Sequence, residues 1–254
     1  MFGAANPAHA GARQNASSFM KNWVKLVAII LLVYVHTAGL LMEVPRLNIL
    51  NETVRALYFH VPMWFGMVLL FLISVYYAIR YLGKPDPATD RMSVEFANVG
   101  LVFGVLGMIT GMIWANYTWG APWSQDPKQI GAGIALLVYM AYFVLRGSLE
   151  NQEQRARLSA VYNIFAFAAM IPLLFIIPRM NNSLHPGSGG NPGFNAYDLD
   201  NRMRLIFYPA VVGWSLVGVW IANLRIRFKT VEEKVTDLEN ENDLTSQVLD
   251  KGLH

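Results

Sequence analysis

The sequence predicts an all-α, polytopic membrane protein with six transmembrane helices and an extracytoplasmic tryptophan-rich loop. Of its 254 residues, 54% are hydrophobic and only 15% are charged, and the mean hydropathy is +0.34. The hydrophobic residues form six runs close to the roughly 20 residues that a helix needs to cross a bilayer. These runs cover residues 23–42, 61–82, 96–115, 129–145, 159–178 and 205–224. Continuous apolar runs exclude a transmembrane barrel, whose strands alternate apolar and polar side chains.

The runs divide the chain into three parts. We expect an N-terminal tail (1–22), a six-helix transmembrane domain (23–224) and a C-terminal tail (225–254). The first run is followed by Met42-Glu43-Val44-Pro45-Arg46, without a small-residue cleavage pattern, so we interpret it as an uncleaved helix.

Two of these segments carry additional signals. The fourth run is the shortest and opens with Gly131-Ala132-Gly133, which predicts close packing through small residues. Beyond Thr230 the C-terminal tail becomes acidic, with Val231, Val235 and Leu238 at helical spacing. We interpret it as a short cytoplasmic amphipathic helix.

Lysine and arginine are divided unequally between the two sides of the predicted membrane domain. Thirteen lie in the two tails and the second and fourth loops, whereas six lie in the first, third and fifth loops. The positive-inside rule therefore predicts that both termini are cytoplasmic and that the odd-numbered loops face outward. In a bacterium the protein is then expected in the inner (cytoplasmic) membrane. The net charge of +3 is explained by this orientation rather than by nucleic-acid binding, because the basic residues are spread along loops.

The three outward loops carry the most unusual residues. His60 precedes Val61-Pro62 at the start of the second span, where proline fixes the first turn of a helix. The third loop is the tryptophan-rich stretch 119–128, and the long fifth loop, about 179–204, carries His185 before a glycine-rich segment. Two imidazoles and flat aromatic walls on one face suit an extracytoplasmic haem. An interfacial aromatic belt and surface histidines are the alternative interpretation.

Other residues near these loops have structural and functional interpretations. Asp126, followed by Pro127 and then Gln129, has the pattern of a helix N-cap with a capping-box partner. Arg55 and Lys128 are placed to pair with haem propionates, although cations are common at membrane ends.

Two features restrict the chemistry of a haem site. His36 lies inside the first span, where an ionisable residue is often functional; the alternative is that it forms a hydrogen bond between helices. The chain has no cysteine, which excludes thiolate ligation, thioether attachment and iron–sulfur clusters. Any haem is therefore held non-covalently, as haem b.

The tryptophan-rich stretch resembles a known signature. Trp114-Ala115-Asn116, Trp119-Gly120 and Trp123-Ser124-Gln125-Asp126-Pro127-Lys128 are similar to the "WWD" motif of the haem-handling proteins of cytochrome c biogenesis, the CcmC/CcsA group. Six spans, a histidine before the second span and another before the sixth fit the shorter, CcmC-like members. Gln125 stands where the motif usually has tryptophan. The resemblance covers roughly residues 23–224.

The resemblance implies a function and a site. Such proteins are not enzymes: they bind haem at the outer face and pass it towards a haem chaperone or apocytochrome c, with ABC-type transporter subunits as partners. It implies His60 and His185 as axial ligands of the haem iron. It further implies a platform and propionate contacts built from Trp119, Trp123, Asp126, and Arg55 or Lys128.

Two other functions remain open from the sequence. A b-type cytochrome subunit in quinone-linked electron transfer needs paired histidines inside the bilayer, and only His36 is available there. A haem-free permease subunit of a transporter is the third possibility.

Overall fold

The computed structural model describes residues 20–46, 50–185 and 199–251, and the regular structure in these ranges is helical. Six helical segments are long and apolar enough to cross a membrane, which confirms the predicted six-span membrane protein. The main helices are α1 (Asn22–Leu41), α2 (His60–Gly83), α3 (Pro87–Trp119), α4 (Pro127–Gly147), α5 (Gln152–Ile171) and α7 (Asn201–Lys251).

Three short elements were not predicted. The 3₁₀ helix η3 (Asn51–Tyr58) leads into α2, while the π-helical turn η4 (Pro172–Ile176) and α6 (Ile177–Met180) continue α5. Pro172 and Pro178 each lack a backbone N–H, which weakens regular α-helical bonding there. Wider π turns of this kind occur mostly as single insertions in α-helices, often near functional sites.

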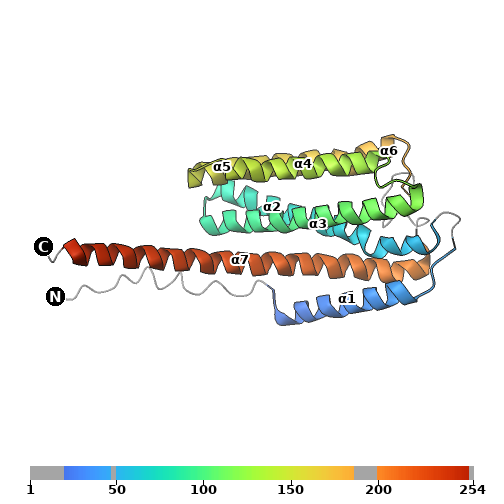
Figure 1. Cartoon of the computed structure of the whole chain (residues 1–254), viewed down its shortest axis with the longest axis horizontal. Helices are drawn as coiled ribbons and strands as arrows, with labels where there is room; N and C mark the ends of the chain where they lie inside the picture. The colour runs from blue at the N-terminus through green and yellow to red at the C-terminus, as the bar shows by residue number, and fades with distance from the viewer. Residues whose placement is uncertain (1–19, 47–49, 186–198, 252–254) are drawn as a thin grey trace.

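The helices pack in layers (Figure 1). On one side of the bundle lie α4 and α5 with α6, the middle is formed by α2 and α3, and α7 separates this middle layer from α1. The largest core cluster lies between α2, α3, α4, α5 and α7, around Met67, Leu70, Phe71, Phe103 and Tyr139. The start of α2, which carries His60, is thus held at the centre of one end of the bundle.

A ladder of glycines fixes how α2 lies against α3. Along α3, four glycines lie so close to α2 that an added Cβ would come within 2.9 Å of the facing side chain. The facing pairs are His60 with Gly111, Trp64 with Gly107, Met67 with Gly104, and Phe71 with Gly100. Small residues allow close helix packing in a bilayer, and the alternating spacing of four and three residues keeps them on one helix face. The ladder therefore sets the register that brings His60 to the tryptophan-rich end of α3.

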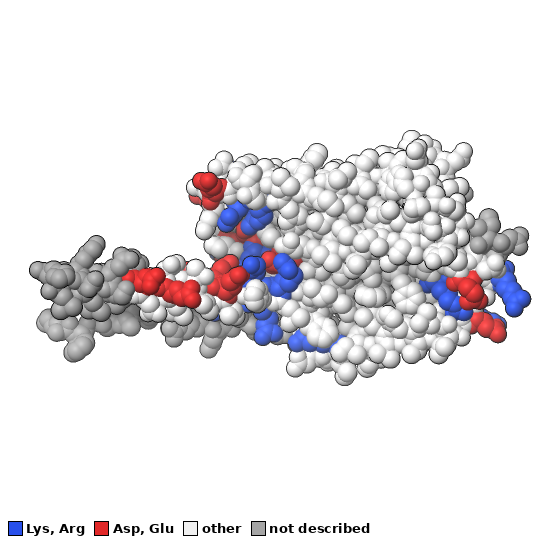
Figure 2. Space-filling view, viewed as in Figure 1, with Lys and Arg blue, Asp and Glu red and all other residues white. Residues whose placement is uncertain are grey.

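Charged residues lie at the two ends of the bundle, with an uncharged band between them on the face shown in Figure 2. We call the end with His60 and the tryptophan-rich loop the site end. At the opposite or far end, Arg146 on α4 forms two hydrogen bonds to Asp90 on α3, at 3.0 and 2.5 Å. The band between the two ends matches the span of hydrocarbon that six helices cross.

The C-terminal tail corrects one expectation. The segment beyond Thr230 does not form a separate amphipathic helix, because α7 runs without interruption from Asn201 to Lys251 and projects beyond the bundle (Figure 1). Arg91 on α3 binds Glu233 and the Thr230 hydroxyl, which ties the first projecting turn to the bundle. The predicted N-terminal tail, up to residue 19, and the glycine-rich part of the fifth loop, within 186–198, lie outside the described residues.

Candidate functional site

His60 is held at the first residue of α2 by α3. Its ring lies against Gly111, where an added Cβ would lie 2.5 Å from the imidazole Cε1. Its Nδ1 is 3.1 Å from the Thr110 hydroxyl. Because that hydroxyl donates its proton to the Leu106 carbonyl, it is left to accept the Nδ1–H of His60. This tautomer leaves Nε2 with a lone pair for a ligand.

His185 is held by Asp126. The Nδ1 of His185 lies 2.8 Å from Asp126 Oδ1, while the Ser183 hydroxyl and the Leu184 N–H both donate to Oδ2, at 2.8 and 2.6 Å. The carboxylate therefore fastens the described start of the fifth loop to the tryptophan-rich loop. Here too the ring is engaged through Nδ1, which leaves Nε2 as the nitrogen for a ligand.

The Asp126 side chain is completely buried and also caps α4, accepting the Lys128 N–H at 2.9 Å. Burial alone raises the pKa of this carboxyl. The His185 imidazole and the donors from Leu184 and Ser183 outweigh that effect and hold the pKa well below its usual value. Asp126 is thus an anion at physiological pH, which fits both the N-cap and the imidazole bond. The N-cap prediction is confirmed.

Gln129 does not complete the predicted capping box. Its Oε1 accepts the N–H and the hydroxyl of Ser124, and its Nε2 donates to the Pro122 carbonyl. The side chain therefore pins the tryptophan-rich loop rather than the N–H of the cap residue. Gln125, which replaces the usual tryptophan, has a positive φ of 56° and is exposed. That left-handed backbone turns the chain into the buried cap.

The tryptophans divide into two groups. Trp119 packs edge-on against the His185 ring at 5.0 Å between centroids, and Trp114 lies 6.3 Å from it and 5.0 Å from Trp119. Trp123 is 42% exposed and its ring approaches Gly133 on α4. The structure therefore brings Trp119 to His185 and places Trp123 on the outside of the loop. Trp114, quoted only as part of the motif, belongs with the histidine.

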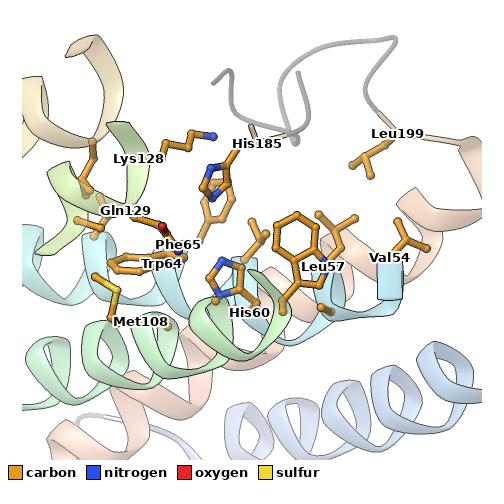
Figure 3. A pocket seen from close by; sticks show the side chains of 18 of the residues that line it. Val54, Leu57, His60, Trp64, Phe65, Met108, Lys128, Gln129, His185 and Leu199 are labelled. Atoms are coloured by element: carbon orange, nitrogen blue, oxygen red, sulfur yellow. The ribbon is translucent and has the colours of Figure 1, made fainter. Parts of the chain in front are cut away.

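Both histidines line one cavity of about 1240 Å³. Figure 3 shows them reaching it from different elements, with Trp64 near His60 and Lys128 near His185. Typical small-molecule pockets have volumes of roughly 300–1,000 Å³, so a tetrapyrrole-sized ligand fits. Trp64 packs edge-on to His60, with the ring centroids 6.2 Å apart.

The cations predicted for the site differ in position. Lys128 lines the cavity. Arg55 is engaged elsewhere: its guanidinium donates to the carbonyls of Gly39 and Met42 at the end of α1 and pairs with Glu52. Arg179 on α6 lines the cavity instead, and sequence reasoning missed it. Its only sequence signal was its position at the outer end of the fifth hydrophobic run.

Several supporting residues were also missed. Thr110 and Gly111 lie inside a hydrophobic run, where nothing distinguishes them from ordinary packing residues. His36, in contrast, bonds to the Leu32 carbonyl in its own helix and packs near Phe59 and Trp214. It is absent from the residues that line the cavity. The predicted alternative, a hydrogen bond between helices, is not what the structure shows, because the bond to the Leu32 carbonyl lies within α1.

The donor set fits a metal that brings its own equatorial ligands. In the described parts of the chain, no group of three or more histidine, cysteine, aspartate or glutamate residues is placed to hold a bare ion. Iron in haem needs only axial ligands from the protein, and imidazole is a common one. Metal-binding histidines usually donate their second N–H to a carboxylate or another acceptor, as both rings do here. The residues present therefore fit haem better than a free metal ion.

The protein is thus a six-span membrane protein in which two imidazoles, each held through Nδ1 by a neighbouring side chain, and several tryptophans surround a wide cavity at one end of the bundle. Residues 4–241 match the family model for CcmC, "Heme exporter protein C". The chain therefore belongs to the CcmC family of haem-handling membrane proteins of cytochrome c biogenesis.

Individual relatives agree with this assignment. The chain is 26% identical to "Heme exporter protein C" of Paracoccus denitrificans over 186 residues, which cover 71% of this chain and 73% of that protein. It is also 26% identical to the protein of that name from Rhodobacter capsulatus, over 74% of this chain and 78% of the relative. A 76-residue segment, 30% of the chain, is 45% identical to 24% of "Cytochrome c biogenesis protein CcsA" from Prochlorococcus marinus. The predicted resemblance to this group is confirmed.

Proposed function

We propose that the protein binds haem b non-covalently between His60 and His185 and delivers it for cytochrome c maturation. The observation that carries the proposal is that these two imidazoles, from distant parts of the chain, line the same cavity with Nδ1 engaged in each. Trp119 and Trp114 flank His185. Lys128 and Arg179 line the cavity and supply positive charge for the two propionate groups of haem. Arg55 is not included, because its donors are occupied at α1.

Delivery requires that one ligand yield to an acceptor's ligand. His60 is fixed by a helix start, a glycine contact and Thr110. His185 belongs to a loop whose described end is fastened mainly through one carboxylate, that of Asp126. We therefore assign His185 as the ligand that is exchanged and His60 as the one that stays.

The location and partners follow from the same proposal. We propose that both termini lie in the cytoplasm and that the site end lies at the periplasmic face of a bacterial inner membrane, which the distribution of lysine and arginine supports. The acceptor is then a haem chaperone or apocytochrome c on that face. The names of the relatives support a haem-export pathway, in which we propose ABC-type transporter subunits as membrane partners. We propose no catalytic step.

The test is the absorption spectrum, oxidised and reduced, of protein purified from cells supplied with excess haem. We expect His60→Ala and His185→Ala each to lose the spectrum of iron with two imidazole ligands. His36→Ala is the matched control, because that ring is bonded within α1, and its spectrum should match the unaltered protein. Unchanged spectra and haem occupancy in both site variants would refute the ligand assignment.

A further inference from the structure

The cavity extends well beyond the two histidines. Its lining continues along one face of α2 through Val61, Phe65, Val68 and Leu72. From His60 to Leu72 the helix rises about 18 Å at 1.5 Å per residue. Because the hydrocarbon core is roughly 30 Å thick, this distance brings the end of the cavity near the middle of the bilayer.

The gap exists because α5 and its continuation η4 diverge from α2. At the far end, Ala78 and Tyr81 on α2 pack with Ala156 and Ala160 on α5 in one buried cluster. Towards the site end, η4 packs against α4 and α5, and within the described residues it has no comparable packing with α2. Gly131 on α4 lies directly against the Leu173 carbonyl, which holds η4 to α4. α2 and the segment formed by α5 and η4 therefore diverge towards the site end.

The opening between α2 and η4 has an apolar edge. Leu69 and Leu72 line the cavity and are also 36% and 50% exposed. Ile176, at the end of η4, is 50% exposed. In a membrane-spanning segment, exposed aliphatic side chains face lipid chains. This side of the cavity is therefore open to the bilayer.

Polarity is distributed unevenly along the cavity. The charged and titratable lining residues lie at the site end, among them His60, Lys128, Arg179 and His185. Most other lining residues are aliphatic or aromatic: Val68, Leu69 and Leu72 line the cavity on α2, and Leu174 and Phe175 line it on η4. An amphipathic ligand with a large apolar body and anionic groups at one edge matches this gradient.

We propose that the gap between α2 and η4 is a lateral portal through which haem enters the site from the outer leaflet of the bilayer. This inference rests on the proposed haem-binding function. The apolar edge of the macrocycle passes Leu69, Leu72 and Phe175, while its carboxylates turn towards Lys128 and Arg179. Along this route the ligand reaches the two imidazoles without passing through water.

The test separates the rate of loading from the strength of binding. Haem-free full-length protein in phosphatidylcholine vesicles is mixed rapidly with haem, which dissolves in the bilayer, and the absorption change on ligation is followed. Leu72→Trp and Leu69→Trp place a bulky ring at the edge of the portal. Ile79→Trp, two turns further along α2 at a 55% exposed position that does not line the cavity, is the matched control.

We expect the portal variants to load about tenfold more slowly, equivalent to about 1.4 kcal/mol in the barrier. Their final spectrum and Kd should equal those of the unaltered protein, because obstructing a route changes association and dissociation alike. Ile79→Trp should load at the normal rate. Normal loading by both portal variants, a raised Kd in them, or equal slowing by Ile79→Trp would overturn the portal. Absence of a two-imidazole spectrum in the unaltered protein would instead refute the proposed function itself.

Discussion

The two ends of the bundle treat buried polar groups in different ways. At the far end, three of them pair with one another: the Ser74 hydroxyl donates to the Ser93 carbonyl at 2.6 Å, and Asn163 Nδ2 donates to Ser74 at 2.7 Å. At the site end, each histidine has its Nδ1 engaged with the protein and lines the cavity. In a bilayer, polar groups need hydrogen-bond partners within the protein, because lipid chains offer none. The far end meets much of that requirement internally, although Asn163 Oδ1, Ser159 Oγ and Asn223 Nδ2 are buried there without a hydrogen-bond partner among the described residues. At the site end the hydrogen-bonded imidazoles border an open cavity instead.

The contacts that stabilise the bundle therefore lie apart from the residues that we propose bind haem. Three helices are joined by the Ser74–Ser93–Asn163 network, and Arg146 with Asp90 joins α4 to α3 nearby. These contacts hold the far end closed. The cavity then opens at the site end without loosening the bundle, and substitutions at the two ends should have separable effects.

The largest effect is expected from Gly111→Ala. The new Cβ would lie 2.5 Å from His60 Cε1, so the ring must move away from Thr110 and from its ligand position. We expect haem affinity to fall by about 100-fold, the upper range for lost support of a metal ligand. Gly147→Ala is the control, because a Cβ there meets nothing within 4 Å. Titration of both variants with haem makes the comparison, and normal affinity in Gly111→Ala would show that His60 is not held as described.

Asp126→Asn should have the next largest effect. The amide keeps some of the cap geometry but loses the charge that holds His185, so haem affinity should fall by about 10- to 100-fold. Asp86→Asn is matched to it, since Asp86 caps α3 before a proline just as Asp126 caps α4. Both variants should keep most of their cap stability, because asparagine is nearly as good an N-cap residue as aspartate. Equal haem affinities for the two would mean that Asp126 is only a cap.

At the far end, Arg146→Ala should reduce stability and leave haem binding unchanged. It removes two hydrogen bonds to Asp90 from a pair whose side chains are only 16% and 17% exposed. We expect a loss of about 1–2 kcal/mol, less than for a fully buried pair. Lys229→Ala breaks an exposed pair with Glu232 and should change stability by about 0–0.5 kcal/mol. Thermal unfolding in detergent measures the stability of both variants, and the haem spectrum is recorded for each. Altered haem affinity in Arg146→Ala would show that the far end and the site end are coupled.

A smaller effect on haem affinity than that of Asp126→Asn is expected from Gln129→Ala, which releases the tryptophan-rich loop. Three hydrogen bonds to Ser124 and Pro122 are lost, but Asp126 still caps α4. Haem affinity should fall by about threefold to tenfold, as for the loss of about 1 kcal/mol of net hydrogen bonding. Gln154→Ala, in the first turn of α5, is the control. A loss as large as that of Asp126→Asn would identify Gln129 as equally important for placing His185.

The membrane architecture and the candidate histidines could be predicted from the amino-acid sequence alone. Six apolar runs must become helices, because lipid offers no partner for backbone N–H and C=O groups. The cap at Asp126 was also readable, since the side chain, Pro127 and α4 are local in sequence. The tail beyond Thr230 was predicted as a helix but not as a continuation of α7. No residue near Thr230 signals whether a helix ends there or continues.

Only the tertiary structure decided which residues meet at the site. Arg55 and Arg179 look equivalent in sequence, yet helix packing directs one to the end of α1 and the other to the cavity. Trp119 and Trp123 lie in the same short loop before Asp126, but the turn at Gln125 and the contact with Gly133 set them on different sides. Hydropathy describes how each residue interacts with lipid or water. Contacts between distant segments depend on side-chain volume and helix register, which here follow from the glycines of α3.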